Sequence, residues 1–425
     1  MRTRSGPGPN VGERGSALPE RSPYLMLVLA TVGFGINFWA WALLSPLGPV
    51  YRDSGRLGEL SQSDIALLVA VPVIVGSLGR IPMGALTDKY GGRLMFVLVS
   101  LATVIPVLYI GLLGQDSFVG LLVAGFFLGI CGTSFAVGIP FVNAWFPPER
   151  RGFATGIFGM GTGGTAISAL TTVKLYHRDD ALPFLLSAAA LTIFAVVAWL
   201  VLRDAPGRMP QTGSLASRVV ANARLPIAWQ AALLYAVAFG GYVAFSVYLP
   251  TYLKNEYGLT PADAANRMAG FVVVAVMMRP VGGWLSDRLG PTRVLVAGYA
   301  VVAVGAAIAA GSPILQPVGT IAFLSMAAAL GSAAGATFAL IARVTDPARV
   351  GGVTGLVGAA GGLGGFVPPL IMGYVYGRTD SYAIGLWMLA VTAVLTLVLT
   401  LTVVRRTAAA HAAAAEAVPT PAGNR

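Results

Sequence analysis

Two arginines stand inside long apolar segments of this 425-residue chain. Arg80 lies in VGSLGRIPMGALTDKYGGR and Arg279 in VAVMMRPVGGWLSDRLG, and each precedes an aspartate by eight residues. At 1.5 Å per helical residue, that spacing places each guanidinium about 12 Å inside its segment, near the middle of a hydrocarbon core about 30 Å thick. Inserting an arginine at that depth costs on the order of 2.5–3.5 kcal/mol. Two arginines placed at this depth despite the cost in free energy indicate a functional role for both.

The guanidinium group indicates which ligand such a pair would bind. It is planar, permanently charged and able to form two parallel hydrogen bonds, which suits a small planar oxyanion better than a sugar or a cation. Two structural alternatives are pairing with a buried acid and extension of the side chain to the interface. All 17 Asp and Glu residues fall in tails, loops or helix ends, and two helical turns is a long way to extend. The residues therefore favour an anion carrier.

The composition agrees with a membrane protein. Hydrophobic residues make up 56% of the chain and charged residues 11%, against about 25% charged in soluble proteins. This excludes an ordinary soluble enzyme. Segments of roughly 20 apolar residues can span a bilayer as helices, and the sequence predicts an all-α integral membrane protein with twelve of them: 24–51, 63–87, 93–113, 117–145, 152–174, 181–203, 226–254, 264–286, 292–312, 315–343, 351–376 and 382–404.

The polar segments divide the chain and orient it. We expect a disordered tail over 1–23 without a signal peptide, six helices over 24–203, a linker over 204–225, six helices over 226–404 and a tail over 405–425, disordered from 407. Of 28 Lys and Arg residues, 19 fall in the tails and the loops of one side and seven in the opposite loops. The positive-inside rule then places both termini in the cytoplasm of a bacterial inner-membrane protein. The basic charge follows this topology, so we expect no nucleic-acid partner.

The two halves repeat at an offset of 199 residues. Twelve identical pairs share this offset, in two separate regions. They are Arg80/Arg279, Gly84/Gly283, Leu86/Leu285, Asp88/Asp287, Gly91/Gly290, Pro148/Pro347, Arg150/Arg349, Gly152/Gly351, Thr155/Thr354, Gly156/Gly355, Gly159/Gly358 and Gly163/Gly362. Two pseudo-symmetric six-helix halves describe a transporter whose substrate site lies between them near mid-membrane.

Glycine-rich stretches open the fifth and eleventh predicted helices. They read GFATGIFGMGTGGTA and GGVTGLVGAAGGLGG. Spacings of three and four residues put their glycines on one helical face, where small residues let neighbouring helices approach and slide. We interpret them as gating segments, with tight packing as the simpler alternative. The candidate residues are Gly156, Gly159, Gly161, Thr162, Gly163, Gly355, Gly358 and Gly362.

Aromatic and hydroxyl side chains supply further candidates for the anion site. Phe135 and Phe338 occupy matching places in the fourth and tenth predicted helices, where a ring can stack on an anion or a guanidinium. On the seventh helix we add Tyr242, Phe245 and Ser246. For each of these side chains, packing or lipid contact is the competing interpretation.

The loops that follow both arginines share a motif. GALTDKYGGR is echoed as GWLSDRLGPTR, so that Asp88 and Arg93 correspond to Asp287 and Arg293. We expect each aspartate to cap or pair with a neighbouring helix and to release it as the halves move. Tight turns carrying topology signals would explain the basic residues but not the repeated aspartate.

These residues also resemble a known family. The loop GALTDKYGGR is similar to the loop between helices 2 and 3 of the major facilitator superfamily. Arg80, Arg279 and GTSFAVGIPFVNAWFPPERRGFATGIFGMGTGG resemble the nitrate/nitrite porters over nearly all the spans. The resemblance implies that the arginines clamp nitrate or nitrite beside Phe135 and that the glycine stretches are signature segments. Where that family commonly carries asparagine in the helix 5 stretch, this chain has Thr162, and its helix 11 counterpart is Gly361.

What drives transport is inferred from the titratable residues that lie inside the predicted spans. A proton-driven carrier usually titrates an intramembrane Asp, Glu or His, whereas here His177 lies near an outer loop and His411 in the tail. We favour nitrate/nitrite exchange, with proton symport and transport of another small or organic anion as alternatives. No enzymatic motif is present, and we expect a monomer with no cofactor and no metal. Two other classes of protein are a receptor and an anion channel. A receptor would need a sizeable soluble domain, which we do not find in the sequence, and a channel would pass far larger currents than a carrier.

Overall fold

The computed structural model describes residues 22–60, 62–206, 214–379 and 381–416, and the regular elements in these ranges are helical. The α-helices are α1 (Pro23–Trp41), α2 (Leu44–Ser54), α3 (Gln62–Tyr90), α4 (Gly92–Tyr109), α5 (Phe118–Leu128), α6 (Ser134–Trp145), α7 (Arg151–Gly159), α8 (Gly164–Tyr176), α9 (Leu182–Val201), α10 (Leu215–Ala223), α11 (Pro226–Tyr257), α12 (Pro261–Leu289), α13 (Pro291–Ala310), α14 (Thr320–Val344), α15 (Val350–Thr379), α16 (Ala383–Leu399) and α17 (Arg405–Glu416). Short 3₁₀ and π turns cover Ile110–Gly114, Gly129–Thr133, Pro148–Arg150, Met160–Gly163, Leu315–Gly319, Pro347–Arg349 and Thr400–Val404.

The predicted all-helical fold is confirmed. In the described ranges, eleven helical segments are long and apolar enough to cross a membrane. The one predicted segment that is not among these eleven is the fifth in chain order, 152–174. It is split into α7 and α8 by the 3₁₀ turn Met160–Gly163. Glycine has poor helix propensity, which explains why the regular helix breaks in its glycine-rich stretch.

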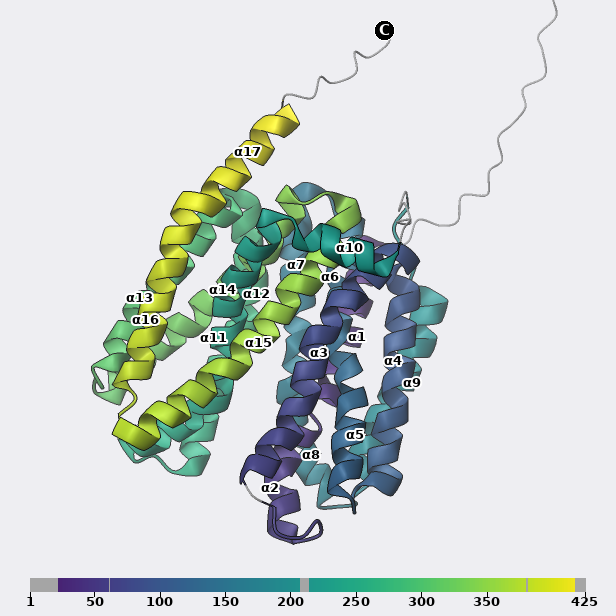
Figure 1. Ribbon diagram of the computed structural model, residues 1–425, viewed down its shortest axis with the longest axis vertical. Helices are drawn as coiled ribbons and strands as arrows, with labels where there is room; N and C mark the ends of the chain where they lie inside the picture. The colour runs from purple at the N-terminus through teal and green to yellow at the C-terminus, as the bar shows by residue number, and fades with distance from the viewer. Residues whose placement is uncertain (1–21, 61, 207–213, 380, 417–425) are drawn as a thin grey trace, which may run out of the picture.

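The chain forms two helical bundles (Figure 1), with α1–α9 in one and α11–α17 in the other. We call them the N-terminal half and the C-terminal half. Their outward surfaces carry large apolar side chains such as Ile105 and Leu113, which are 72% and 75% exposed. Such surfaces suit contact with lipid rather than with water. Helix α10 crosses one end of the molecule, which we call the α10 end, and packs on α3 and α15.

The C-terminal segment corrects one expectation. Residues 405–416 form α17, which continues from α16 through the turn Thr400–Val404, whereas we expected disorder from residue 407. Alanine has the highest helix propensity, and a segment that extends an existing helix avoids the cost of nucleation. The expected disordered tail over 1–23 falls almost entirely outside the described residues, and α1 begins at Pro23.

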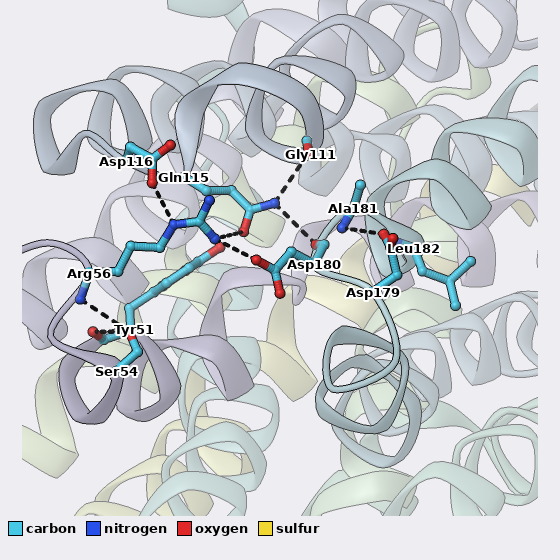
Figure 2. Close-up of polar contacts among 10 residues, drawn as sticks. All are labelled: Tyr51, Ser54, Arg56, Gly111, Gln115, Asp116, Asp179, Asp180, Ala181 and Leu182. Atoms are coloured by element: carbon cyan, nitrogen blue, oxygen red, sulfur yellow. Dashed lines mark hydrogen bonds and ion pairs between the residues drawn. The ribbon is translucent and has the colours of Figure 1, made fainter.

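At the end opposite α10, one arginine joins three loops of the N-terminal half (Figure 2). Arg56 pairs through Nε with Asp116, and its Nη1 lies 2.6 Å from a carboxylate oxygen of Asp180. Gln115 donates to the carbonyl oxygens of Gly111 and Asp180, each at 3.1 Å. The hydrogen bond to Asp116 is the main cause that raises the pKa of Arg56 above its ordinary value. The network ties together the outer ends of this half.

We expect Arg56→Ala to lower the melting temperature only slightly. Its partners are more than half exposed, and exposed ion pairs contribute about 0–1 kcal/mol each. Thermal unfolding in detergent should move by about 1–3 °C, and by less in 1 M salt because screening weakens the pairs. Arg267→Ala, which removes a single pair with Asp263, is the control and should change less. A drop above about 10 °C would contradict this estimate.

Candidate functional site

Both predicted arginines are buried between the two halves. Arg80 on α3 is 1% exposed and Arg279 on α12 is 4% exposed. Arg80 donates from Nε to the carbonyl oxygen of Gly132 at 3.0 Å and from Nη1 to that of Gly358 at 2.7 Å. The first acceptor belongs to its own half and the second to the other half, so Arg80 bridges the interface.

Arg279 makes the corresponding bridge with hydroxyl groups. Its Nη2 donates to the Tyr235 hydroxyl at 3.0 Å, within its own half. Its Nη1 lies 3.4 Å from Oγ1 of Thr162 in the other half. Arg279 is thus bound by hydroxyl groups, which can rotate, whereas Arg80 is bound by backbone carbonyls.

Aromatic rings fill the space between the arginines. The guanidinium carbon of Arg80 lies 5.2 Å from the centre of the Phe135 ring, and that of Arg279 lies 5.4 Å from the Phe239 ring. The Tyr235 ring stacks on both of these rings, with centroids 5.9 and 5.0 Å apart. Phe338 meets Phe135 and Tyr235 edge to face. The arginines are therefore connected through a continuous aromatic wall, and the ring faces attract the guanidinium groups.

Each glycine-rich helix lies against the arginine of the opposite half. A Cβ placed on Gly159 would come within 2.7 Å of Nε of Arg279, and one on Gly358 within 3.0 Å of Cδ of Arg80. Gly156 and Gly355 lie equally close to the backbone of α12 and α3. A side chain at these four positions would push the halves apart. Among the other candidates, Gly161 packs on Phe34, Gly362 on Ser77, and a Cβ on Gly163 would meet nothing within 4 Å.

The repeated aspartates also bind across the interface. Asp88 accepts hydrogen bonds from the backbone N–H groups of Gly351 and Gly352 at 3.1 and 2.8 Å. Asp287 accepts from those of Gly152 and Phe153 at 3.0 and 2.8 Å. Each carboxylate thus caps the first turn of the opposite glycine-rich helix, where the helix dipole favours negative charge. These four bonds lie at the α10 end.

The two motif arginines lie elsewhere. Arg93 stacks on Trp199 and donates to its carbonyl oxygen, and Arg293 donates to the carbonyl oxygen of Leu289 at 3.3 Å on the surface. Instead, Arg343 binds the carbonyl oxygen of Asp287. These contacts place the carboxylates, rather than the motif arginines, between the halves.

The predicted residues of the seventh helix separate into two groups on α11. Tyr242 lines a small cavity beside Arg279, with room for about one water molecule. Phe245 packs on Phe271 and Phe323 and lines a separate apolar cavity between α11, α15 and α16. The Ser246 hydroxyl donates to the carbonyl oxygen of Val243 in its own helix. A role in substrate binding stays a prediction for all three.

Sequence reasoning missed Tyr235 and Phe239, which both contact the arginine environment. A signal was present, because Tyr235, Phe239 and Tyr242 are spaced four and three residues apart and so lie on one face of a helix. The seventh helix is apolar on every side, however, so its pattern could not indicate which face turns towards Arg279.

The halves are in contact at the α10 end and diverge towards the opposite end. Near α10, Gly84 meets Gly351 and Gly283 meets Gly152 at backbone distance. Further along the same helices, Gly76 contacts Gly129 of its own half, and Gly365 contacts Val243 of its own half. Figure 1 shows α3 and α15 separating in that direction. The two parts of the fifth predicted helix differ in the same way. Helix α7 packs on α12 and α14 of the C-terminal half, whereas α8 packs on α1, α2 and α9 of its own half.

Comparison with known proteins defines the class. The family model of the Major Facilitator Superfamily matches residues 30–265 and 231–424. A solved structure of the human organic anion transporter MFSD10 covers 90% of this chain and 100% of its own with a TM-score of 0.76 at 14% identity, and the proton:xylose symporter XylE gives 0.75. These distant structures support the fold alone.

Sequence relatives narrow the family. The chain is 48% identical over 371 residues to the probable nitrate/nitrite transporter NarK2 of Mycobacterium tuberculosis, covering 86% of this chain and 93% of that protein. It is 35% identical to the nitrite extrusion protein of Bacillus subtilis, covering 88% and 93%. The chain is a multi-pass membrane protein that belongs to the major facilitator superfamily and, within it, to the nitrate/nitrite porter family.

Proposed function

We propose that this protein carries nitrate and nitrite across the bacterial inner membrane by alternating access, as an exchanger, with Arg80 and Arg279 holding the anion. The observation that carries the proposal is the pair of buried arginines joined by an aromatic wall between the two halves. The names of the relatives supply the substrate. The site chemistry, with planar cations beside aromatic faces, supplies an independent argument for a small planar anion.

The α10 end is the cytoplasmic side in this proposal. The loops at this end carry the excess of Lys and Arg, which are retained in the cytoplasm. The structure then corresponds to a state closed towards the cytoplasm, held by Asp88 and Asp287. Breaking the four hydrogen bonds of these carboxylates would let α7 and α15 move away from α12 and α3, and would open the site on that side.

Exchange follows from the charges at the site. With no anion bound, two guanidinium groups repel one another in a region of low dielectric constant, and an anion between them attracts both and offsets part of their charge. The loaded carrier therefore changes state more readily than the empty one. No Asp, Glu or His lies in the middle of a predicted span, so the sequence offers no ordinary proton-accepting side chain beside the arginines.

Proteoliposomes test this mechanism. Vesicles that contain nitrite should accumulate labelled nitrate at least about tenfold faster than empty vesicles, and a proton ionophore should leave this rate unchanged. An acid pulse that drives nitrate into empty vesicles, with loss of uptake when the ionophore is added, would instead establish proton symport. If another small anion supports faster exchange than either ion, the protein is a carrier for that anion.

A further inference from the structure

The two arginines differ in how completely the protein satisfies them. Both Nη atoms of Arg279 have hydroxyl partners. Arg80 uses Nε and Nη1 on carbonyl oxygens, and its Nη2 has no hydrogen-bond partner among the described residues although the atom is fully buried. A buried guanidinium N–H without an acceptor is costly. An anion oxygen would supply the missing acceptor.

A second unsatisfied group lies one helical turn before Arg80. The Ser77 side chain is 0% exposed, and its Oγ makes no hydrogen bond within the described residues. This is unusual for a serine in an apolar helix, because such hydroxyls normally donate to the carbonyl three or four residues earlier. Ser134 and Ser286 do so in this protein, to Cys131 and Gly282.

The Ser77 hydroxyl and the guanidinium group of Arg80 approach the same point of α15. A Cβ placed on Gly362 would overlap Oγ of Ser77 and would lie 3.7 Å from Nη1 of Arg80. Ser77 and Arg80 therefore present their polar atoms to one place in the interface between the halves. This interface is the surface that must separate if the carrier opens towards the cytoplasm.

The repeat shows that this hydroxyl is not a remnant of symmetry. At the offset of 199 residues, Ser77 corresponds to Val276, which lines the small cavity beside Arg279. Thr162, the hydroxyl partner of Arg279 in the opposite half, corresponds to Gly361. Arg80 thus has the Ser77 hydroxyl of α3 nearby, and Arg279 has the Thr162 hydroxyl of the turn Met160–Gly163. Of these two hydroxyls, that of Ser77 has no hydrogen-bond partner among the described residues.

We infer that Ser77 Oγ and Arg80 Nη2 form a donor pair that binds one oxygen of the transported oxyanion when α15 moves away from α3. The inference rests on the proposed function and adds a substrate-binding residue to that site. It also explains why the pair tolerates burial without partners, since hydrogen bonds left unmade in the protein are made to the substrate. Serine serves as a neutral donor that leaves the net charge of the site unchanged.

A purely steric role makes a different prediction. If Ser77 is needed only because it is small enough to meet Gly362, alanine should replace it without effect. If it binds substrate, Ser77→Ala should weaken anion binding about tenfold. The melting temperature without anion should stay the same or rise, because a buried hydroxyl without a partner is removed.

The experiment measures thermal stability of the purified full-length protein in detergent over a nitrate titration. Ser187→Ala is the matched control, because Ser187 is also 0% exposed and has no hydrogen-bond partner in the part of the chain that the structure describes, but lies on α9. Ser77→Cys, which keeps the size and substitutes a weak donor, serves if Ser77→Ala does not fold. The apparent dissociation constant should rise for both Ser77 variants and stay at the wild-type value for Ser187→Ala.

Two results would overturn the inference: wild-type affinity in the Ser77 variants, or an equal loss in Ser187→Ala. The titration is repeated with nitrite, chlorate and formate. If wild type responds to neither nitrate nor nitrite, the proposed function is wrong, and Ser77 is judged on whichever oxyanion does bind. If none of these oxyanions raises the melting temperature of the wild-type protein, both the proposed function and the inference about Ser77 are wrong.

Discussion

Replacing either buried arginine with lysine should reduce nitrate uptake into proteoliposomes by about a hundredfold or more. Lysine keeps the charge but loses the planar fork that serves several acceptors at fixed angles. Arg80 already uses Nε and Nη1 for Gly132 and Gly358. An ammonium group would have to reach both carbonyls and an anion from a single nitrogen, without the spread of the planar guanidinium group. Hydrogen bonds to charged groups contribute about 1.5–3 kcal/mol each, and 1.4 kcal/mol is tenfold in affinity.

The control for this experiment is Arg293→Lys. Arg293 is an exposed arginine of α13 that donates to the carbonyl oxygen of Leu289 at the end of α12, and the same substitution there should leave uptake unchanged. Melting temperatures of all three variants show whether the protein remains folded. Uptake above about one third of wild type in Arg80→Lys or Arg279→Lys would contradict the arginine clamp while leaving the family assignment intact.

Gly283→Ala should prevent closure at the α10 end. A Cβ on Gly283 would overlap the carbonyl oxygen of Gly152 in the opposite half, and backbone cannot rotate away as a side chain can. Overpacking of this kind costs about 1–3 kcal/mol, which shifts an equilibrium between two states by about 5–150-fold. The variant should fold, because each half is unchanged internally, but should exchange nitrate poorly.

Cysteine labelling measures this shift directly. The one cysteine of the chain, Cys131, is buried, so it provides an unreactive background for an introduced thiol. Thr354→Cys places a reporter in the first turns of α15, at a position buried in the closed state. With Gly283→Ala, a membrane-impermeant maleimide should label it several times faster from the α10 side.

Gly163→Ala is the matched control, because a Cβ on Gly163 would meet nothing within 4 Å. Both changes add one methyl group to a glycine, at Gly283 on α12 and at Gly163 in the turn Met160–Gly163. Equal labelling and equal exchange in the two alanine variants would show that the glycine contact at Gly283 does not set the conformation.

Several features of the site could be predicted because they are encoded locally. An arginine in an apolar segment is informative without knowledge of its neighbours, since burial follows from the segment itself. The offset of 199 residues then implies that Arg80 and Arg279 occupy equivalent places. By contrast, the Arg56 network joins loops some 60 residues apart, and nothing in the charges of those loops specifies which acid meets which base.

Hydropathy and repetition are properties of the chain, so two helical halves in a membrane, each with one buried arginine, could be predicted from the residues alone. The contacts between helices come from the tertiary structure: Arg80 and Asp88 contact α15, whereas Arg279 and Asp287 contact the turn Met160–Gly163 and α7. The same holds for the place of Tyr235 between the arginines and for Ser77, whose hydroxyl has no partner among the described residues. Helix packing in a bilayer depends on which small residues meet across an interface. A helix that is apolar on all sides does not record that choice in its own pattern.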